Sequence, residues 1–220
     1  MRGPQQTSDA ENAKEGKKPL KTSRILGFFR PHHTSRLFPK RLVHQHCFQL
    51  QAWQTQGKGP DETHTFKTDR VSSAVAKFIA LTKQSGHIDE QELEKVFEKL
   101  APVSPDVFVG EWQGHSVDTG HPGVAKNKEL RWAGKTFRGV DDVDPMVALD
   151  ANGKRVWMEE IGHARLREVK YKGLVSTAMI YNQYPIIDHF RRINDTTVAG
   201  CMDTPLMPEA GIFYFYLTKL

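Results

Sequence analysis

A series of short apolar runs joined by turn residues constrains the fold of this chain most strongly. The links between these runs are only a few residues long, which permits antiparallel pairing, whereas a parallel crossover needs about a dozen residues or more. The link Asp150-Ala151-Asn152-Gly153 is a strong hairpin signal, because an Asn-Gly pair suits a turn with two positive φ angles. The sequence therefore predicts an antiparallel β meander that begins near Pro145. Its strands are expected at residues 146–149, 154–158, 163–171, 174–181, 186–193, 197–202 and 211–220.

Such a meander has to protect its edge strands from pairing with other chains. Closure into a barrel removes both edges, and a sandwich of two sheets is the alternative. We expect the closed arrangement, which makes residues 103–220 a mainly β domain with a barrel-like antiparallel sheet.

Two short helices are predicted before the strands. Residues 71–84 repeat apolar side chains at helical spacing, with Asp69 as the candidate N-cap. Asp89 is the candidate N-cap of a second helix over residues 90–100, which also carries an apolar stripe. We expect these helices to form a hairpin within residues 62–102 that packs on the body of the protein.

Charge separates the first 61 residues from the rest of the chain. They hold 11 Lys or Arg against 4 Asp or Glu, whereas the full chain has a net charge of +5. The folded body is therefore close to neutral, and we expect no nucleic acid among its partners. A polar, basic segment without a sustained apolar period is expected to be a disordered extension. Its Arg-rich stretch also fits a mitochondrial transit peptide, although Asp9 and Glu11 near the start weigh against that alternative.

Cysteine usage and hydropathy indicate the compartment. The chain has two cysteines, Cys47 and Cys201, too few for a disulfide framework, which predicts reduced thiols and a cytoplasmic location. The longest apolar stretch falls short of the run of about 18 residues that spans a bilayer, so no membrane span is expected. The histidines lack the regular spacing of metal ligands, and we expect neither a metal nor another cofactor.

Two motifs with glycine and tryptophan precede the meander. Gly110-Glu111-Trp112-Gln113-Gly114 predicts a tight chain reversal whose indole plugs one end of the barrel. Stacking on a ligand is the alternative role for Trp112, although a buried Trp normally serves packing. The second motif, Trp132-Ala133-Gly134-Lys135-Thr136, lacks the full Gly-x4-Gly-Lys-Ser/Thr pattern and does not predict a phosphate loop.

These motifs give the chain a resemblance to a known family. Gly110–Gly114 matches the motif that names the GXWXG domain. Gly162–Arg165 and Pro185–Arg191 resemble the carboxy-terminal domain of unknown function that accompanies it. The resemblance covers about half of the chain, Val103–Leu220. The opening Gly-x-Trp also resembles lipocalins and fatty-acid-binding proteins, which implies a calycin-like barrel, but the family resemblance implies no established activity.

The predicted strands place charged side chains among apolar ones. His163 and Arg165 share one face of the strand over residues 163–171, and Asp188 lies among apolar residues on the strand over 186–193. Mixed faces fit a barrel in which polar groups orient a ligand. A structural ion pair between Arg165 and Asp188 is the alternative. The predicted ligand-binding residues are Trp112, Arg165, Tyr181 and Asp188.

Two functions fit this pattern. The first is a barrel that binds a hydrophobic, possibly acidic, small molecule, with Arg165 meeting the acidic group. The second is a cofactor-independent isomerase, cyclase or hydrolase, in which Asp188 acts with His163 or His189 as acid and base. The first is favoured, because the sequence lacks a Gly-x-Ser-x-Gly motif and metal-ligand spacing. An interaction role rests on residues 1–61 alone.

The composition of the extension predicts that it is dispensable for folding. A chain that starts near Glu62 should unfold cooperatively at nearly the melting temperature of the full chain, because residues 1–61 lack the apolar period of a core segment. Thermal unfolding followed by circular dichroism checks this. An insoluble product, or one without a cooperative transition, would show that the extension belongs to the core.

Overall fold

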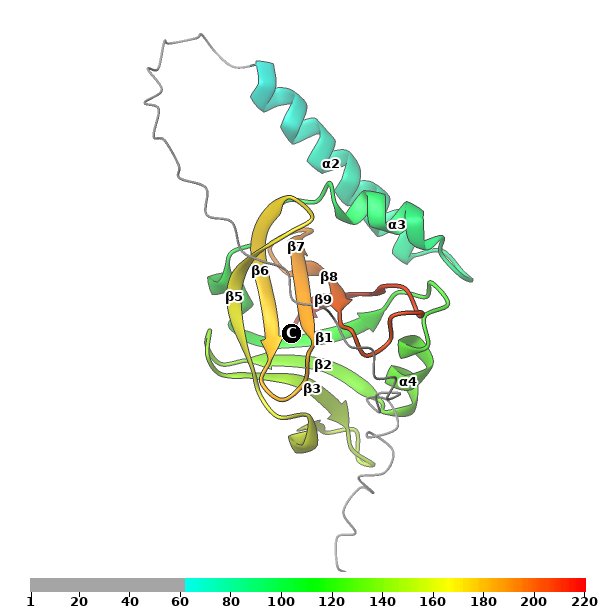
Figure 1. The fold of residues 1–220 in the computed structure, drawn as a ribbon, viewed down its shortest axis with the longest axis vertical. Coiled ribbons are helices and arrows are strands. Elements are labelled where there is room, and N and C mark those ends of the chain that lie inside the picture. Colours follow the sequence, from blue (N-terminus) through cyan, green and yellow to red (C-terminus); the bar gives the residue numbers. More distant parts are fainter. Residues whose placement is uncertain (1–61) are drawn as a thin grey trace, which may run out of the picture. The chain divides into compact units, whose positions relative to one another are not determined.

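The computed structural model describes residues 62–220, with side chains from residue 69 onward. The predicted extension, residues 1–61, lies outside the described residues. Figure 1 shows two helices, α2 (Glu62–Thr82) and α3 (Glu90–Phe97), ahead of a β domain. Three further short helical segments are η1 (Pro105–Phe108), α4 (Gly123–Glu129) and η2 (Glu159–Ile161).

The β domain contains nine strands in the described part of the chain. They are β1 (Gly110–Ser116), β2 (Trp132–Phe137), β3 (Val143–Leu149), β4 (Arg155–Trp157), β5 (Ala164–Tyr171), β6 (Leu174–Tyr181), β7 (Ile187–Arg192), β8 (Thr197–Asp203) and β9 (Phe213–Lys219).

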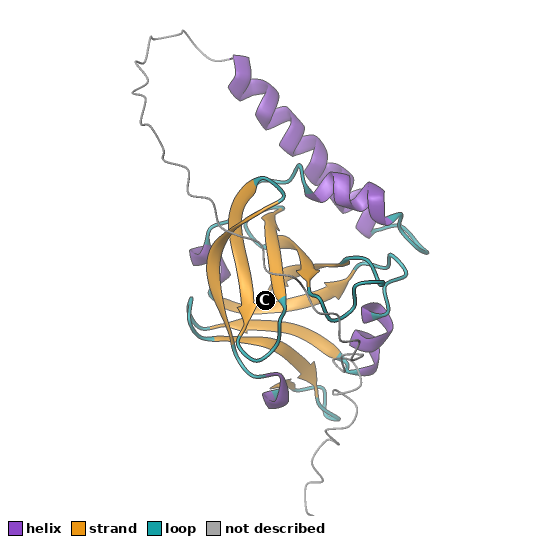
Figure 2. Ribbon diagram, in the orientation of Figure 1, coloured by secondary structure: helices purple, strands orange, loops and turns teal. Residues whose placement is uncertain are grey.

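Eight of these strands close into an antiparallel barrel (Figure 2). Their order is β2-β1-β9-β8-β7-β6-β5-β3, and the pairing between β2 and β3 completes the ring. Strand β4 joins β3 as the predicted hairpin, with Gly153 at a φ of +79° in its turn. The predicted mainly β, closed fold is confirmed, and a sandwich is excluded because one continuous sheet returns to its first strand.

The first two barrel strands differ from the sequence-based expectation. Gly110–Gly114 was expected to reverse the chain, but this segment lies within strand β1, and that prediction is wrong. Gly110, the first residue of β1, has a φ of +125°, which an L side chain rarely adopts. Strand β2 carries Gly134 at a φ of +126°, and its register with β3 shifts at this residue. These irregularities hide the period of two that would reveal a strand.

The predicted helical hairpin is present with different limits. Asp89 caps α3, because its carboxylate accepts a hydrogen bond of 2.7 Å from the backbone N–H of Glu92. Helix α2 begins at Glu62, so Asp69 lies inside it and is not its N-cap. The sequence before Val71 lacks the apolar repeat that would have shown the earlier start. None of the described helices has both the length and the apolar character needed to span a membrane.

The apolar stripes of α2 and α3 pack on the outside of the barrel, beside β8 and β9 (Figure 1). From the helices, the shared apolar cluster takes Phe78, Leu93 and Phe97, and from the barrel wall it takes Ala199 and Tyr214. Residues on β8 that lie in this cluster face outward, so the alternate residues of the same strand face the barrel interior.

Pairing register extends this assignment around the barrel. On β8, Gly200 alternates with the outward-facing Ala199, and Gly200 pairs with Phe190 of β7. Directly paired residues lie on the same face of a sheet. Asp188, two residues before Phe190, therefore also faces inward, together with its partner Met179 on β6.

One end of the barrel is filled by aromatic rings. Phe108 of η1 lies with its ring centroid 5.7 Å from that of Trp112, 5.1 Å from Phe137 and 4.8 Å from Phe190. The Trp112 indole N–H donates a hydrogen bond of 2.6 Å to the Phe108 carbonyl, and both side chains are fully buried. The indole of the motif thus packs at this end of the barrel.

The second glycine of the motif makes room for a different indole. A Cβ on Gly114 would lie 2.4 Å from the ring of Trp132, far inside van der Waals contact. Gly200 of β8 does the same for the ring of Phe215, which a Cβ would also approach to 2.4 Å. The rings of Trp132 and Phe215 meet edge to face at 5.9 Å, so two glycines on different strands admit one aromatic pair.

Replacing Gly114 with Ala should destabilise the barrel, because the rigid indole of Trp132 has to move. Overpacking of this kind typically costs about 1–3 kcal/mol, so the melting temperature should fall and the near-UV circular dichroism should change. Gly139→Ala is the matched control, since nothing lies within 4 Å of a Cβ there. A Gly114→Ala protein with both properties unchanged would contradict this packing.

Candidate functional site

A lysine and an aspartate form an ion pair inside the barrel. The Nζ atom of Lys135 lies 2.8 Å from Oδ2 of Asp188, and each side chain is only 2% exposed. Lys135 comes from β2 and Asp188 from β7, strands that are not neighbours in the barrel. The pair therefore crosses the interior. Taking two charges out of water is costly, so a core that only packs would favour apolar residues here.

The Lys135 ammonium is held by two further oxygens. It lies 3.0 Å from the Pro145 carbonyl and 3.4 Å from the Tyr181 hydroxyl, and donates to both. Together with the ion-pair contact to Asp188, these bonds surround the ammonium with three oxygens.

Aromatic rings surround the same ammonium. The ring of Phe215 lies 5.1 Å from Nζ, and the rings of Trp132 and Tyr181 each lie 5.7 Å from it. A cation over aromatic faces gains electrostatic stabilisation that grows as water is excluded. The positions of these rings follow from Gly114 and Gly200, because a Cβ at either glycine would displace one of them.

Asp188 and Tyr181 form the hydrogen-bonding part of the cluster. Burial raises the pKa of Tyr181 well above its usual value, and the charge of Asp188 and a hydrogen bond to it raise this pKa further. The hydroxyl is therefore a neutral donor to the carboxylate at ordinary pH. Oδ2 of Asp188 accepts no well-directed hydrogen bond from the described residues, so its contact with Lys135 is electrostatic.

The interior is not equally closed at its two ends. Phe108 and Trp112 are fully buried at one end. Trp132 and Met202, near the ion pair, are partly exposed. Met202 pairs with Asp188 across β7 and β8, so it faces the same side of the sheet as the carboxylate. Two side chains beside the cluster are therefore partly accessible to solvent at the Trp132 end.

Arg165 does not meet Asp188, so the pairing proposed from the sequence does not form. Arg165 pairs with Ile180, whereas the next residue, Leu166, pairs with Met179 on the face that carries Asp188. Alternation along β5 therefore points Arg165 outward, where its guanidinium donates a hydrogen bond to the Asn182 side chain. Lys135 is the cation that pairs with Asp188 inside the barrel. The sequence-based site did not include it, because β2 precedes the predicted meander whose alternation supplied the charged candidates.

Neither candidate histidine joins the inner cluster. His189 follows Asp188 directly on β7 and so points to the opposite face. There its ring stacks on Tyr171 at 3.8 Å, with Nε2 3.6 Å from Oδ2 of Asp203. His163 stacks on Trp157 at 4.2 Å. The acid–base pair of Asp188 with a histidine, expected for the enzyme alternative, is not assembled.

His163 belongs instead to a group of charged residues on the outer face of the barrel. It lies near Asp142 and Asp144, and ligand atoms of the three residues are within 4.8 Å of one another. The Arg138 guanidinium donates hydrogen bonds of 2.7–2.9 Å to both carboxylates. Hydrogen bonding to Arg138 also holds the pKa of Asp142 below its usual value. An arginine that satisfies both aspartates makes this group an ion-pair network rather than a metal centre.

A second buried polar group fastens α3 to the barrel wall. Arg191, 1% exposed, donates to the backbone carbonyls of Phe190 and Tyr171, each at 3.0 Å. Its guanidinium also lies 5.3 Å from the ring centroid of Phe97. Burial raises the pKa of the neighbouring Cys201 thiol to about 12, so this cysteine stays a protonated thiol with a packing role.

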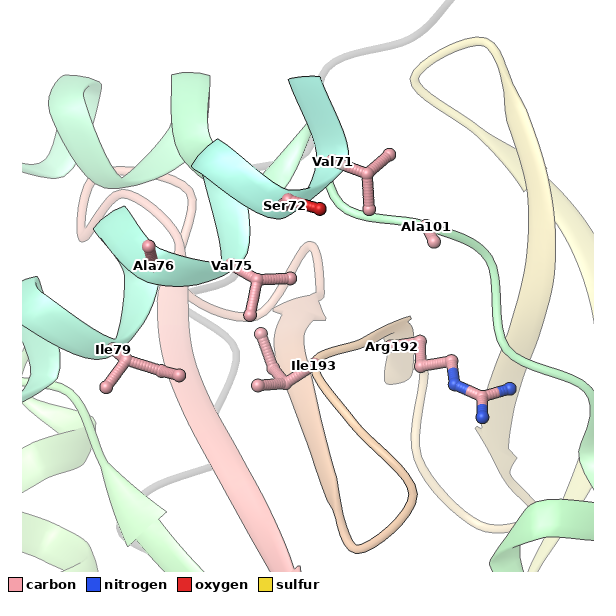
Figure 3. Close-up of a pocket in the computed structure, with 8 residues that line it drawn as sticks. All are labelled: Val71, Ser72, Val75, Ala76, Ile79, Ala101, Arg192 and Ile193. Atoms are coloured by element: carbon pink, nitrogen blue, oxygen red, sulfur yellow. The ribbon is translucent and has the colours of Figure 1, made fainter. Parts of the chain in front are cut away.

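A separate groove lies between α2 and the turn after β7 (Figure 3). It encloses about 480 Å³ and is mainly apolar. Arg192 is its charged residue, and this side chain points away from α2 in Figure 3 and pairs with Asp195. The groove therefore offers an apolar surface, and its charged lining residue, Arg192, is already paired. Its lining residues are Val71, Ser72, Val75, Ala76, Ile79, Ala101, Arg192 and Ile193.

Two family models match the chain, one after the other. The model described as GXWXG protein matches residues 95–153, and a domain of unknown function, DUF4334, matches residues 162–219. The chain belongs to the GXWXG family. In this GXWXG protein, Lys135 lies in the first matched region, whereas Tyr181 and Asp188 lie in the second. The inner cluster is therefore assembled from both regions of one barrel.

A solved structure supports the same fold. The GXWXG protein resembles a crystal structure of a protein from Thermomonospora curvata, with 39% sequence identity and a TM-score of 0.61. The similarity covers 68% of this chain and 98% of that chain. No curated protein matches the sequence.

Burial of His189 should make the stability of the protein depend on pH. Desolvation lowers the pKa of this histidine below its usual value, so the unfolded chain binds its proton more readily than the folded chain. Stability should therefore be fully present above about pH 6.5, the ordinary histidine value, and decline as the pH falls below it. Melting temperatures measured between pH 7.5 and pH 5.5 check this.

His189→Gln is the comparison, and its melting temperature should fall less steeply over the same pH range. Burial also lowers the pKa of His115 and of His121, so part of the slope should persist in the variant. An unchanged slope in His189→Gln would show that this histidine does not contribute.

Proposed function

We propose that this GXWXG protein binds a hydrophobic small molecule inside its barrel, next to the Lys135–Asp188 ion pair. The observation that carries the proposal is the pair itself, since both charges are buried within a closed barrel. A pair of this kind is weak support for stability, because its desolvation cost can exceed its Coulombic gain. A role in orienting a ligand would account for an ion pair at this buried position.

The surroundings of the pair suit the apolar part of such a ligand. Trp132 and Phe215 present aromatic rings, and Met179 and Met202 flank Asp188 on the neighbouring strands. Binding sites for small molecules are mostly apolar with a few placed polar groups. The partly exposed end near Trp132 and Met202 is the side from which we propose that the ligand enters.

An enzyme that works without a cofactor is the second candidate. It is favoured by one observation, the contact of both Asp188 and the neutral Tyr181 hydroxyl with Lys135, which sets a possible proton acceptor near a possible donor. Binding is preferred because neither His163 nor His189 reaches Asp188. The cytoplasmic location suggested by the reduced thiols is part of the same proposal.

The proposal predicts that the protein carries a ligand when purified from its own organism. Native mass spectrometry should show an added mass of small-molecule size, which denaturation releases. Lys135→Met should lose this mass, because it removes the interior cation. Arg165→Met is the matched control and should retain it, because Arg165 faces outward. Wild-type protein without an added mass, or equal loss in both variants, would contradict binding inside the barrel.

A further inference from the structure

The inner cluster is electrically balanced before any ligand arrives. It contains one ammonium, Lys135, one carboxylate, Asp188, and the neutral hydroxyl of Tyr181. A ligand carboxylate would bring a second negative charge to one cation in a site from which water is largely excluded. Such an unpaired charge is strongly disfavoured away from water. The balance therefore favours a neutral ligand over the acidic ligand that Arg165 suggested from the sequence.

Hydrogen-bonding capacity narrows the choice further. The Lys135 ammonium donates hydrogen bonds to the Pro145 carbonyl and the Tyr181 hydroxyl, and it forms an ion pair with Asp188. The Tyr181 hydroxyl stays neutral, because burial and the charge of Asp188 raise its pKa, and it accepts a hydrogen bond from Lys135. Among these side chains, Oδ2 of Asp188 is the buried atom without a well-directed hydrogen bond from the described residues. The cluster thus offers a buried acceptor oxygen, whereas two of the three donors of the Lys135 ammonium are already engaged in hydrogen bonds.

We infer that the ligand of the barrel is a neutral apolar molecule with a hydroxyl group, which donates its hydrogen bond to Asp188. This inference rests on the proposed binding function and specifies its ligand class. A hydroxyl that donates to a carboxylate forms a short, charge-assisted hydrogen bond. It adds no net charge, and its apolar remainder lies against the rings of Trp132 and Phe215.

Three matched probes test the inference on the full-length protein: 1-octanol, methyl octyl ether and octanoate. The ether keeps the oxygen but loses the donor, and octanoate adds a negative charge. Isothermal titration calorimetry should show that octanol binds at least about tenfold more tightly than either of the others, the gain expected for a hydrogen bond to a charged group.

The outcomes separate the inference from the function on which it rests. Equal or tighter binding of the ether or of octanoate would overturn the inference and leave barrel binding intact. Failure of all three probes to bind would contradict both.

A charge exchange in the cluster gives an independent test. Asp188→Asn keeps the shape of the side chain but leaves the Lys135 ammonium without its anion, so the preference should reverse by about tenfold in favour of octanoate. Arg165→Met, on the outer face, should keep the preference for octanol. An Asp188→Asn protein that still prefers octanol would overturn the inference.

A double variant covers the case in which an unpaired buried lysine prevents folding. Lys135→Met with Asp188→Leu leaves the cluster without charges and without an acceptor at position 188. It should fold, bind octanol and the ether within about twofold of each other, and gain no affinity for octanoate. A retained preference for octanol in the double variant would show that Asp188 is not the acceptor.

Discussion

The Lys135–Asp188 ion pair is the interaction around which the interior of this barrel is organised. It joins strands that do not touch in the sheet, across a space from which water is largely excluded. An ammonium in such a place needs a full set of oxygens, and it has them in Asp188, the Pro145 carbonyl and the Tyr181 hydroxyl. It also gains from aromatic faces, and three rings provide these. The surrounding oxygens and rings stabilise the charge of Lys135 inside the barrel.

The motif that names the family serves this arrangement in two ways. Trp112 packs against Phe108 and helps to fill one end of the barrel, so that the polar cluster lies toward the other. Gly114 has no side chain because the indole of Trp132 occupies the space where its Cβ would be. The motif thus combines Trp112, which fills one end of the barrel, with Gly114, which leaves space for the ring of Trp132 beside Lys135. Its glycines act within a strand, where a turn had been expected.

Much of the secondary structure was predictable because it depends on local patterns. The hairpin at Gly153 follows from its Asn-Gly turn, and the cap at Asp89 follows from the preference of helix ends for a carboxylate. Strand β1 was missed because Gly110 and Gly114 occupy positions where an apolar alternation would show, and β2 was missed because a positive φ angle and a register shift at Gly134 interrupt its alternation. Lys135 lies on one of these strands, which is why the interior cation escaped the sequence-based site.

The sequence by itself determined that this chain forms an antiparallel β domain with two helices before it, because short links and period-two patterning favour antiparallel neighbours. Closure into a barrel was the expected way to protect the strand edges, and the pairing of β2 with β3 decided it against a sandwich. It also identified Asp188 and Tyr181 as candidate site residues. Only the tertiary structure decided which face of each strand points inward. Alternation divides the residues of a strand between two faces, but it does not show which face points inward when both carry charges, as on β5. The packing of α2 and α3 on Ala199 and Cys201 fixes the outer face of β8, and the register then carries that choice to Asp188, inside, and to Arg165, outside.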